Sequence, residues 1–474
     1  MQACFQMSNP MRMGNGGRPD QMLDAETVDS LNQLFGLPNV TENKFIYLDC
    51  QSEYGLNGSL NRVRDLCARA AADGQSSLAL TDVGNLYGAI HFFKAAQEYG
   101  IKPIIGCRIH VAPESRLHKP RSFKAKPGHQ LILLAKDVVG FQNLIALVSL
   151  AHMEGYFCRP RVDKELLSRY QEGLIAISPS RNGPVSACLA NKGTDAAIDI
   201  AGFLKGTFPD SFYLGIEPSE IPDSPEINAA TVELATATRL PLVATMSCRY
   251  PDEEESLIYD ILWCINSGIS LNNIHHYSRG RYPFHYRSDD EAALLFQNFP
   301  EALTSTVQIA EACNVDLAAF IRSMPDNSGS SDARQHFVLP GQAIGAISFH
   351  RWSIPELIED VGKTLGFEPV EARQAYSWEK ARELTAGYGQ FLMSDESSRP
   401  DDPMDDPPAD PELLCYAVNK LAGYASHIAP DTEYYTPVLP HLGGNVPLCR
   451  DEDNAPISQW DRESLACLES LNAT

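Results

Sequence analysis

The sequence predicts an α/β fold closed into a barrel, followed by a smaller, mainly helical region. From Lys44 onward, short apolar runs alternate with segments whose apolar residues recur at helical spacing. About seven such units follow within about 200 residues, which favours a barrel over an open sheet. Hydrophobic residues make up 44% and charged residues 21% of the 474-residue chain, as in ordinary globular proteins. That length allows two or three domains.

The predicted elements follow one another along the chain. The expected strands are short apolar runs at 45–48, 78–81, 103–111, 130–134, 174–177, 212–216 and 242–245. The expected helices lie between them at 60–70, 87–99, 141–152, 195–204 and 227–238. Gly74 and Gly100 follow the first two helices, where glycine is typical. Strands that alternate with helices predict a parallel sheet.

Changes in composition divide the chain into six parts. The Asp- and Pro-rich run at 394–412 cannot bury a core, so we expect a disordered linker there. The other parts are a flexible arm at 1–43, the barrel at 44–315, a Ser- and Gly-containing linker at 316–340, a helical segment at 341–393 and a final segment at 413–474.

Charge and cysteine usage narrow the function classes. The formal net charge of −23 argues against a large basic DNA-binding surface, because DNA affinity rests mainly on Lys and Arg that neutralise phosphates. The 12 cysteines include no CxxC pair, so no zinc ribbon or thioredoxin-like motif is visible. No apolar run is long enough to span a membrane, and residues 1–20 lack the apolar stretch of a secretory signal. We therefore expect a cytoplasmic protein with weak or absent DNA binding and no membrane partner.

Several stretches in collinear order resemble one known family. They are Phe45–Tyr54, Ala79–Leu86, Gly100–Cys107, Arg159–Glu165 and Leu240–Thr245, within residues 44–314. This region resembles the N-terminal PHP (polymerase and histidinol phosphatase) domain of bacterial C-family DNA polymerases, the DNA polymerase III alpha subunits. The resemblance implies a (β/α)7-like barrel.

Two later segments resemble parts of the same family. Residues 344–366 look like the helix-rich, fingers-like segment that follows the polymerase palm, and residues 455–461 look like a Gln-Trp-Asp segment of the error-prone branch. The palm, with its acidic triad for two magnesium ions, should lie between them. Residues 315–339 fill that space and contain no Asp-x-Asp motif. The resemblance implies a truncated alpha-subunit-like chain without polymerase activity.

The family's metal site is largely altered in this chain. In the family, His, Asp and Glu side chains at the barrel mouth hold metal ions whose bound water becomes a nucleophile. By resemblance, Asp49, Asp82 and His129 are the remaining candidate ligands. Family ligand positions that carry unsuited side chains are Tyr47, Gln51, Val83, Arg108, Ser180, Ser247 and Arg249.

Two interpretations of this site remain open. The three remaining ligands could hold a single Zn or Mn ion, because carboxylates and imidazole suit both metals. Arg108 and Arg249 would repel such an ion by energies on the order of several kcal/mol in a partly buried site. We expect these two arginines to pair with Asp49 and Asp82, so that salt bridges replace the metal and no cofactor is bound.

These observations lead to three hypotheses about function. The first is a structural or protein-binding component of DNA replication or error-prone repair, with the sliding clamp or other polymerase components as partners. The second is a residual metal-dependent phosphoesterase or 3′-5′ exonuclease that uses Asp49, Asp82 and His129. The third is a decaying remnant, which should fold poorly because drifting sequences lose core packing.

Three smaller features have ordinary explanations. Adjacent histidines such as His275 and His276 rarely converge on one metal, so we expect a surface loop there. Leu34 and Phe35 faintly resemble a clamp-binding peptide, but an amphipathic helix end explains them better. Trp352 and Trp460 could stack on bases, although packing in a core or interface is the better explanation.

Overall fold

The computed structural model describes residues 45–56, 58–120, 127–273, 282–317, 320, 343–376, 411–437, 447–450, 456–461 and 463–464. The chain divides into two units, Met1–Asn43 and Lys44–Thr474, and all described residues belong to the second. Four sequence expectations lie mostly or entirely outside the described residues. They are the arm at 1–43 with Leu34 and Phe35, the pair His275 and His276, the linker at 316–340 and the acidic linker at 394–412.

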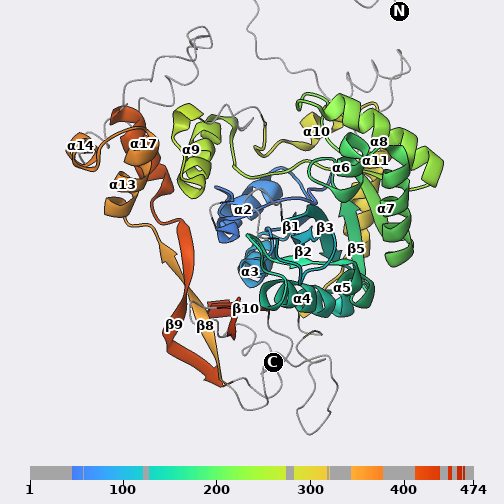
Figure 1. Ribbon diagram of the computed structural model, residues 1–474. Coiled ribbons are helices and arrows are strands. Elements are labelled where there is room, and N and C mark those ends of the chain that lie inside the picture. Colours follow the sequence, from blue (N-terminus) through green and yellow to red (C-terminus); the bar gives the residue numbers. More distant parts are fainter. Residues whose placement is uncertain are drawn as a thin grey trace, which may run out of the picture. The chain divides into compact units, whose positions relative to one another are not determined.

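A curled sheet forms the centre of the second unit (Figure 1). Its strands in the described residues are β1 (Ser77–Leu80), β2 (Lys102–Val111), β3 (His129–Ala135), β4 (Arg161–Val162), β5 (Leu174–Ser178), β6 (Phe212–Ile216) and β7 (Leu242–Ala244). The order is β1-β2-β3-β5-β6-β7, and β4 pairs with β2. The pairs β1–β2, β2–β4, β5–β6 and β6–β7 are parallel.

The third strand corrects the expectation of an all-parallel sheet. β3 runs antiparallel to both β2 and β5. A parallel connection needs a crossover of a dozen or more residues, usually a helix, whereas an antiparallel neighbour can follow a loop. The described residues between β2 and β3 form turns and bends rather than a helix. β3 therefore returns beside β2 in the opposite direction.

The segment 45–51 joins the two edges of this sheet. The backbone of Cys50 forms one isolated parallel β-bridge to Leu80, at the end of β1, and another to Cys248, beyond β7. The Ala79 N–H donates to the Tyr47 carbonyl and the Cys248 N–H donates to the Asp49 carbonyl, each at 2.9 Å. The apolar run that was expected as the first strand thus connects β1 with the segment after β7 and closes the barrel. The predicted α/β barrel class is confirmed.

Helices surround the sheet. In chain order they are α2 (Val63–Ala72), α3 (Ala89–Glu98), α4 (Val138–Met153), α5 (Lys164–Arg169), α6 (Pro184–Asn191), α7 (Thr194–Thr207), α8 (Ser224–Thr238), α9 (Ser256–Ser267), α10 (Asp289–Leu295) and α11 (Pro300–Ala312), with short 3₁₀ turns at Glu53–Gly55 and Glu253–Glu255. None of the described helices is long and apolar enough to cross a lipid bilayer.

One end of the barrel is filled by apolar residues. Ile104, Ile132 and Val243 belong to a buried cluster that also contains Ile309 of α11. The Lys102 ammonium, at the start of β2, donates to the Ala310 carbonyl at 2.7 Å. The C-terminal part of α11 therefore covers the amino ends of the strands, and the polar residues gather at the opposite end.

The C-terminal region contains both helices and strands. α13 (Ile354–Thr364), α14 (Pro369–Ala375) and α17 (Pro411–Leu421) share a buried apolar cluster with α9 of the preceding region. β8 (Ala343–Arg351) pairs antiparallel with β9 (Ala425–Pro437). The helix-rich expectation for residues 344–366 is therefore wrong for the first part of that segment. Alternation in Ile344-Gly-Ala-Ile-Ser-Phe349 and the distant partner strand explain the difference.

A final pair of short strands packs on the barrel. β10 (Leu448–Arg450) pairs antiparallel with β11 (Pro456–Ser458). The Trp460 indole N–H donates to the Leu86 carbonyl at 3.1 Å, and the ring stacks 6.4 Å from Phe141 of α4. Trp460 is fully buried, and Trp352 is 8% exposed within the helical cluster. Both tryptophans are therefore packing residues, as expected.

Candidate functional site at the barrel mouth

The altered family positions meet at the carboxyl ends of the strands. Asp49 follows the apolar run 45–48, Asp82 follows β1, Arg108 lies in β2 and Ser247 follows β7. Side chains at these strand ends converge on one mouth in α/β barrels. These four positions therefore lie together at the mouth of the barrel.

A bidentate salt bridge joins Arg108 to Asp49. Arg108 Nε donates to Asp49 Oδ1 at 2.8 Å, and Arg108 Nη2 donates to Asp49 Oδ2 at 2.7 Å. The two side chains are 2% and 0% exposed, so water does not weaken their attraction. The Thr81 hydroxyl donates to Oδ1 at 3.2 Å, and the Ser247 hydroxyl donates to Oδ2. The predicted pairing of Arg108 with Asp49 is confirmed.

These contacts keep Asp49 ionised. Burial alone would raise its pKa, but the charge of Arg108 and its hydrogen bonds outweigh that effect. The Ser247 hydrogen bond and the more distant charge of Arg249 act in the same direction. The pKa of Asp49 is therefore lowered, and both carboxylate oxygens are engaged by donors.

Asp82 has a different environment. Its Oδ1 accepts the Ser52 N–H and its Oδ2 accepts the Ser52 hydroxyl, each at 2.7 Å. Burial raises the pKa of Asp82 to about 7 in spite of these hydrogen bonds, with a further contribution from Glu53. No ion pair to Asp82 is present in the described part of the chain.

The expected pairing of Arg249 with Asp82 is therefore wrong. Arg249 Nη1 donates to the Tyr259 hydroxyl at 2.9 Å, and the guanidinium lies 4.7 Å from the centre of the Phe284 ring. The Arg249 N–H also donates to the Phe284 carbonyl at 2.7 Å. The returning segment 282–287 thus gives Arg249 an aromatic partner, which guanidinium groups favour.

His129 lies at the rim of the mouth rather than inside it. It begins β3 opposite Val111 and is exposed, whereas the next residue, Gln130, is opposite His110. Because neighbouring side chains in a strand point to opposite faces, His129 and Gln130 cannot face the same interior. The side-chain oxygen Oε1 of Gln130 accepts a hydrogen bond from Arg108 Nη1 at 2.9 Å, so the Gln130 side chain is the one that points inward.

The remaining predicted positions lie in varied surroundings. The Tyr47 hydroxyl bonds the backbone of Arg287, and its ring stacks on Tyr286 outside the sheet. The backbone of Val83 forms an isolated parallel β-bridge with the backbone of Arg108. Gln51 Nε2 and Ser180 Oγ are buried and have no hydrogen-bond partner among the described residues.

Sequence reasoning missed two groups at this mouth. The Gln130 amide bonds His110 Nε2 at 3.0 Å, and burial, together with Arg159 and Arg108, lowers the pKa of His110 to about 4. Glu217 follows β6, and its pKa is raised by burial although Arg181 lies 3.4 Å away. The strand-end rule would have identified Glu217, and the pleat of β3 would have identified Gln130.

The described residues contain no group of three or more His, Cys, Asp or Glu side chains arranged to hold a metal ion. At the mouth, Asp49 and Asp82 are satisfied by Arg108 and Ser52 respectively, and His129 lies on the other face of its strand. The three candidate ligands therefore do not converge.

Comparison with known proteins agrees with this architecture. The model of the PHP domain family matches residues 48–219. A DNA polymerase III subunit alpha from Borreliella burgdorferi is 37% identical over 273 residues, covering 57% of this chain and 24% of that protein. One from Treponema pallidum is 35% identical over 272 residues, covering 57% of this chain and 23% of that protein.

The chain thus spans about a quarter of the length of the curated relatives it matches. A solved amidohydrolase from Chromobacterium violaceum aligns with 44% of this chain and 88% of its own, with a TM-score of 0.29 and 15% identity, and we draw nothing from a likeness of that size. The family match and the sequence identity lead to one conclusion: the protein contains a PHP domain and is a relative of DNA polymerase III alpha subunits.

Proposed function

We propose that this protein is a cytoplasmic structural or interaction component of DNA replication or error-prone repair, and that its barrel mouth carries no metal-dependent chemistry. The observation that carries the proposal is the buried bidentate contact between Arg108 and Asp49. In this proposal the contacts of Arg108 with Asp49 and Gln130 hold the mouth together in place of a metal.

The chemistry of the donor set supports an inert mouth. A metal-dependent phosphoesterase needs open carboxylate or imidazole ligands and a bound water that the metal activates. The two oxygens of Asp49 already accept from the guanidinium of Arg108. A divalent cation beside that guanidinium would meet repulsion on the order of several kcal/mol.

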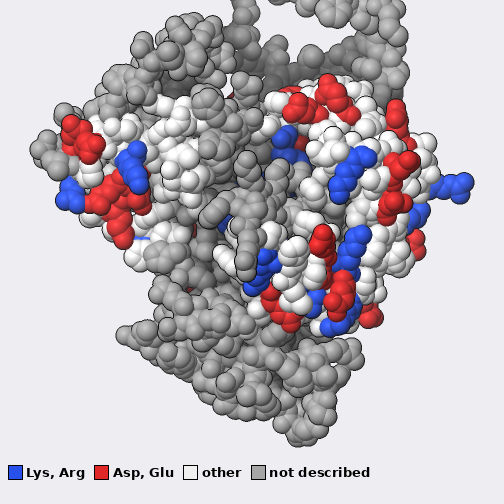
Figure 2. Space-filling model, viewed as in Figure 1, with Lys and Arg blue, Asp and Glu red and all other residues white. Residues whose placement is uncertain are grey.

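The surface charge bears on the kind of partner. Figure 2 shows Lys and Arg side chains interspersed with Asp and Glu over the described surface of one face. The whole chain carries a formal net charge of −23. Both observations favour a protein partner, such as a sliding clamp or another polymerase component, over duplex DNA.

Metal content tests the inert mouth directly. We would dialyse the purified full chain against Mn and Zn and measure bound metal by elemental mass spectrometry. The proposal predicts substoichiometric metal in a protein that unfolds cooperatively. Stoichiometric metal that disappears in Asp49→Asn would overturn it.

The alternative, a residual phosphoesterase or 3′-5′ exonuclease, predicts metal-dependent hydrolysis of a model phosphodiester that is lost in Asp82→Asn. Equal hydrolysis by this variant and the unaltered protein would exclude it. A cooperative thermal transition of the full chain would count against the decaying-remnant hypothesis.

A further inference from the structure

A second polar site lies next to the mouth. A cleft of about 690 Å³ is lined by Val83 and the next two residues, Gly84 and Asn85. The backbone of Val83 forms a β-bridge with Arg108 of the mouth. This volume is within the range of small-molecule sites in proteins. Other lining residues come from the turn before α3, the segment after β2, the end of α4, the loop before β4 and the strand β10, and those used below are Tyr87, Lys119, His152, Tyr156, Arg159 and Cys449.

The charged side chains that line this cleft are both cations. Among the described residues that line it, the charged ones are Lys119 and Arg159, with no Asp or Glu, in a chain with 61 acidic and 38 basic residues. Neither cation has an ion pair or side-chain hydrogen bond among the described residues. The end of α4 contributes only about half a negative charge, so the cleft attracts an anion.

An aromatic surface accompanies the two cations. Tyr156 is 53% exposed and lies in the lining of the cleft. Tyr87 is buried behind it, close enough for its titration to respond to Tyr156 and Cys449. An exposed tyrosine at the edge of a cleft offers a face on which a planar ring can stack.

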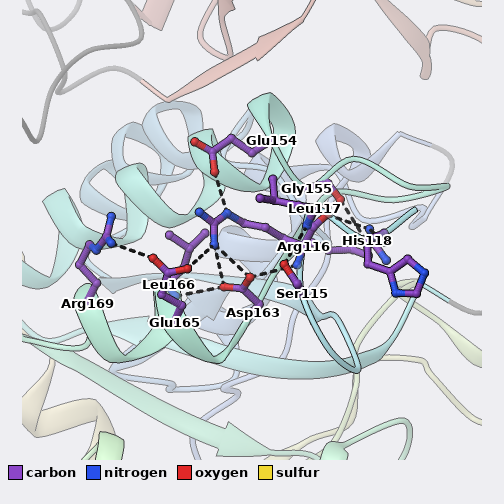
Figure 3. Close-up of polar contacts among 11 residues, drawn as sticks. Ser115, Arg116, Leu117, His118, Glu154, Gly155, Asp163, Glu165, Leu166 and Arg169 are labelled. Atoms are coloured by element: carbon purple, nitrogen blue, oxygen red, sulfur yellow. Dashed lines mark hydrogen bonds and ion pairs between the residues drawn. The ribbon is translucent and has the colours of Figure 1, made fainter. Parts of the chain in front are cut away.

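The walls of the cleft are held in place by two arginines. The Arg161 guanidinium donates to the carbonyls of Gly155, Arg116 and His118, each at 3.0 Å. These carbonyls lie on the backbone directly beside Tyr156 and Lys119. Arg116 in turn binds Glu154, Asp163 and Glu165 (Figure 3). The side chains that would contact a ligand therefore extend from a fixed frame, which lowers the entropy cost of binding.

We propose that this cleft binds an organic phosphate with a planar ring, that is, a nucleotide. The ring stacks on Tyr156, and the phosphate lies between Lys119 and Arg159. The nucleotide can be a free mononucleotide or the terminal nucleotide of a DNA strand, because both present the same groups. The inference goes beyond the proposed function and does not depend on the metal content of the barrel mouth.

Calorimetric titration of the full chain tests this site. The probes are deoxyadenosine monophosphate, deoxyadenosine, inorganic phosphate and a short single strand with a 5′-phosphate. We expect the monophosphate to bind more tightly than the nucleoside or phosphate alone. A single strand that binds more tightly than the monophosphate would identify a strand end as the source, and the reverse order would identify a free nucleotide.

Matched variants make the test specific. Arg159→Gln should weaken nucleotide binding about tenfold, as expected for the loss of one charge-assisted hydrogen bond. Arg64→Gln removes an exposed cation from α2, outside the cleft, and should leave binding unchanged. Tyr156→Ala should weaken nucleotide binding without affecting phosphate binding, and Tyr156→Phe should retain both.

Three results would overturn the proposal. One is the absence of saturable binding by both the monophosphate and the single strand. The second is an equal effect of Arg159→Gln and Arg64→Gln. The third is binding of an acidic peptide in the absence of nucleotide binding. Lys119, Tyr156 and Arg159 are all exposed, so unfolding of the variants is not expected, and circular dichroism would verify this.

Discussion

Two arginines near the end of β2 bind carboxylates in opposite ways. Arg108 meets one carboxylate, Asp49, in a site where both side chains are almost fully buried. Arg116 meets three carboxylates, and its partners Glu154 and Glu165 are 34% and 59% exposed. Inside the barrel an unbalanced charge is costly, so one cation faces one anion. Around Arg116 the partner Asp163 is also buried, with a side chain 5% exposed, and water screens only the two outer acids, Glu154 and Glu165.

The largest effect should follow from breaking the buried pair. Arg108→Met leaves the Asp49 carboxylate buried without its counter-ion, and we expect a loss of about 3–5 kcal/mol in the free energy of unfolding. Urea denaturation at neutral pH measures it. The double variant Arg108→Met with Asp49→Leu should recover much of that loss, because paired apolar groups need no counter-ion. A single variant as stable as the unaltered protein would contradict the comparison.

Asp82 sharpens the comparison because it is a buried carboxylate without an arginine. Its folded pKa is about 7, whereas an unfolded aspartate titrates near about 3.9. The folded state therefore holds a proton that the unfolded state releases between these values. Its contribution to stability is full below about pH 4 and is lost as the pH rises through 7, by about 4 kcal/mol.

Asp82→Asn should remove that part of the pH dependence. Urea midpoints of the variant and the unaltered protein, measured from pH 4 to pH 8, give the difference. The lowered pKa of Asp49 predicts the opposite slope, with stability present above the unfolded pKa and lost as the pH falls. Identical pH profiles for Asp82→Asn and the unaltered protein would contradict the prediction.

Breaking the Arg116 network should cost less, because its central carboxylate keeps backbone donors and its outer carboxylates reach water. Arg116→Met removes three ion pairs, but Asp163 keeps hydrogen bonds from the backbone N–H groups of residue 116 and Leu166. Glu154 and Glu165 can turn towards water. We expect a loss of about 1–2 kcal/mol, measured by urea denaturation. A loss as large as that of Arg108→Met would show that burial does not distinguish the two networks.

The smallest effect belongs to the edge of the same network. Arg169 is 55% exposed and pairs with Glu165 one helical turn away. Arg169→Gln should change the free energy of unfolding by less than about 0.5 kcal/mol, as exposed helical pairs usually do. Thermal denaturation at low and high salt measures it. A larger, salt-insensitive change would indicate that Arg169 is more than a surface residue.

The sequence predicted the elements of the barrel better than their directions. Apolar runs located the strands, because burial on both faces leaves little room for polar residues. The direction of β3 depends on what connects it to β2, and periodicity within the strand does not reveal that. The helix-rich expectation for the segment that contains β8 came from the family resemblance, and the partner of β8 lies more than seventy residues away in sequence, where the resemblance does not indicate a strand.

At the site, too, the sequence predicted some contacts and missed those that depend on distant segments or on the direction of a side chain. Two arginines among the family ligand positions, Arg108 and Arg249, predicted acidic partners, and Asp49 and Asp82 were the candidates; the structure pairs Arg108 with Asp49. Arg249 was expected to pair with an aspartate as well, but Tyr259 and Phe284 reach it from segments that the sequence does not place. His129 was chosen from the family resemblance, whereas the pleat of β3 turns its neighbour Gln130 inward.

The contact made by Trp460 also has a consequence for synthesis of the chain. Its ring occupies a site formed by Leu86 and Phe141, and Gln459 completes it by accepting the Leu86 N–H. A ribosome must add more than three hundred residues after Phe141 before this site can be filled. During that time the nascent barrel presents an apolar surface, and a chaperone has its best opportunity to bind there.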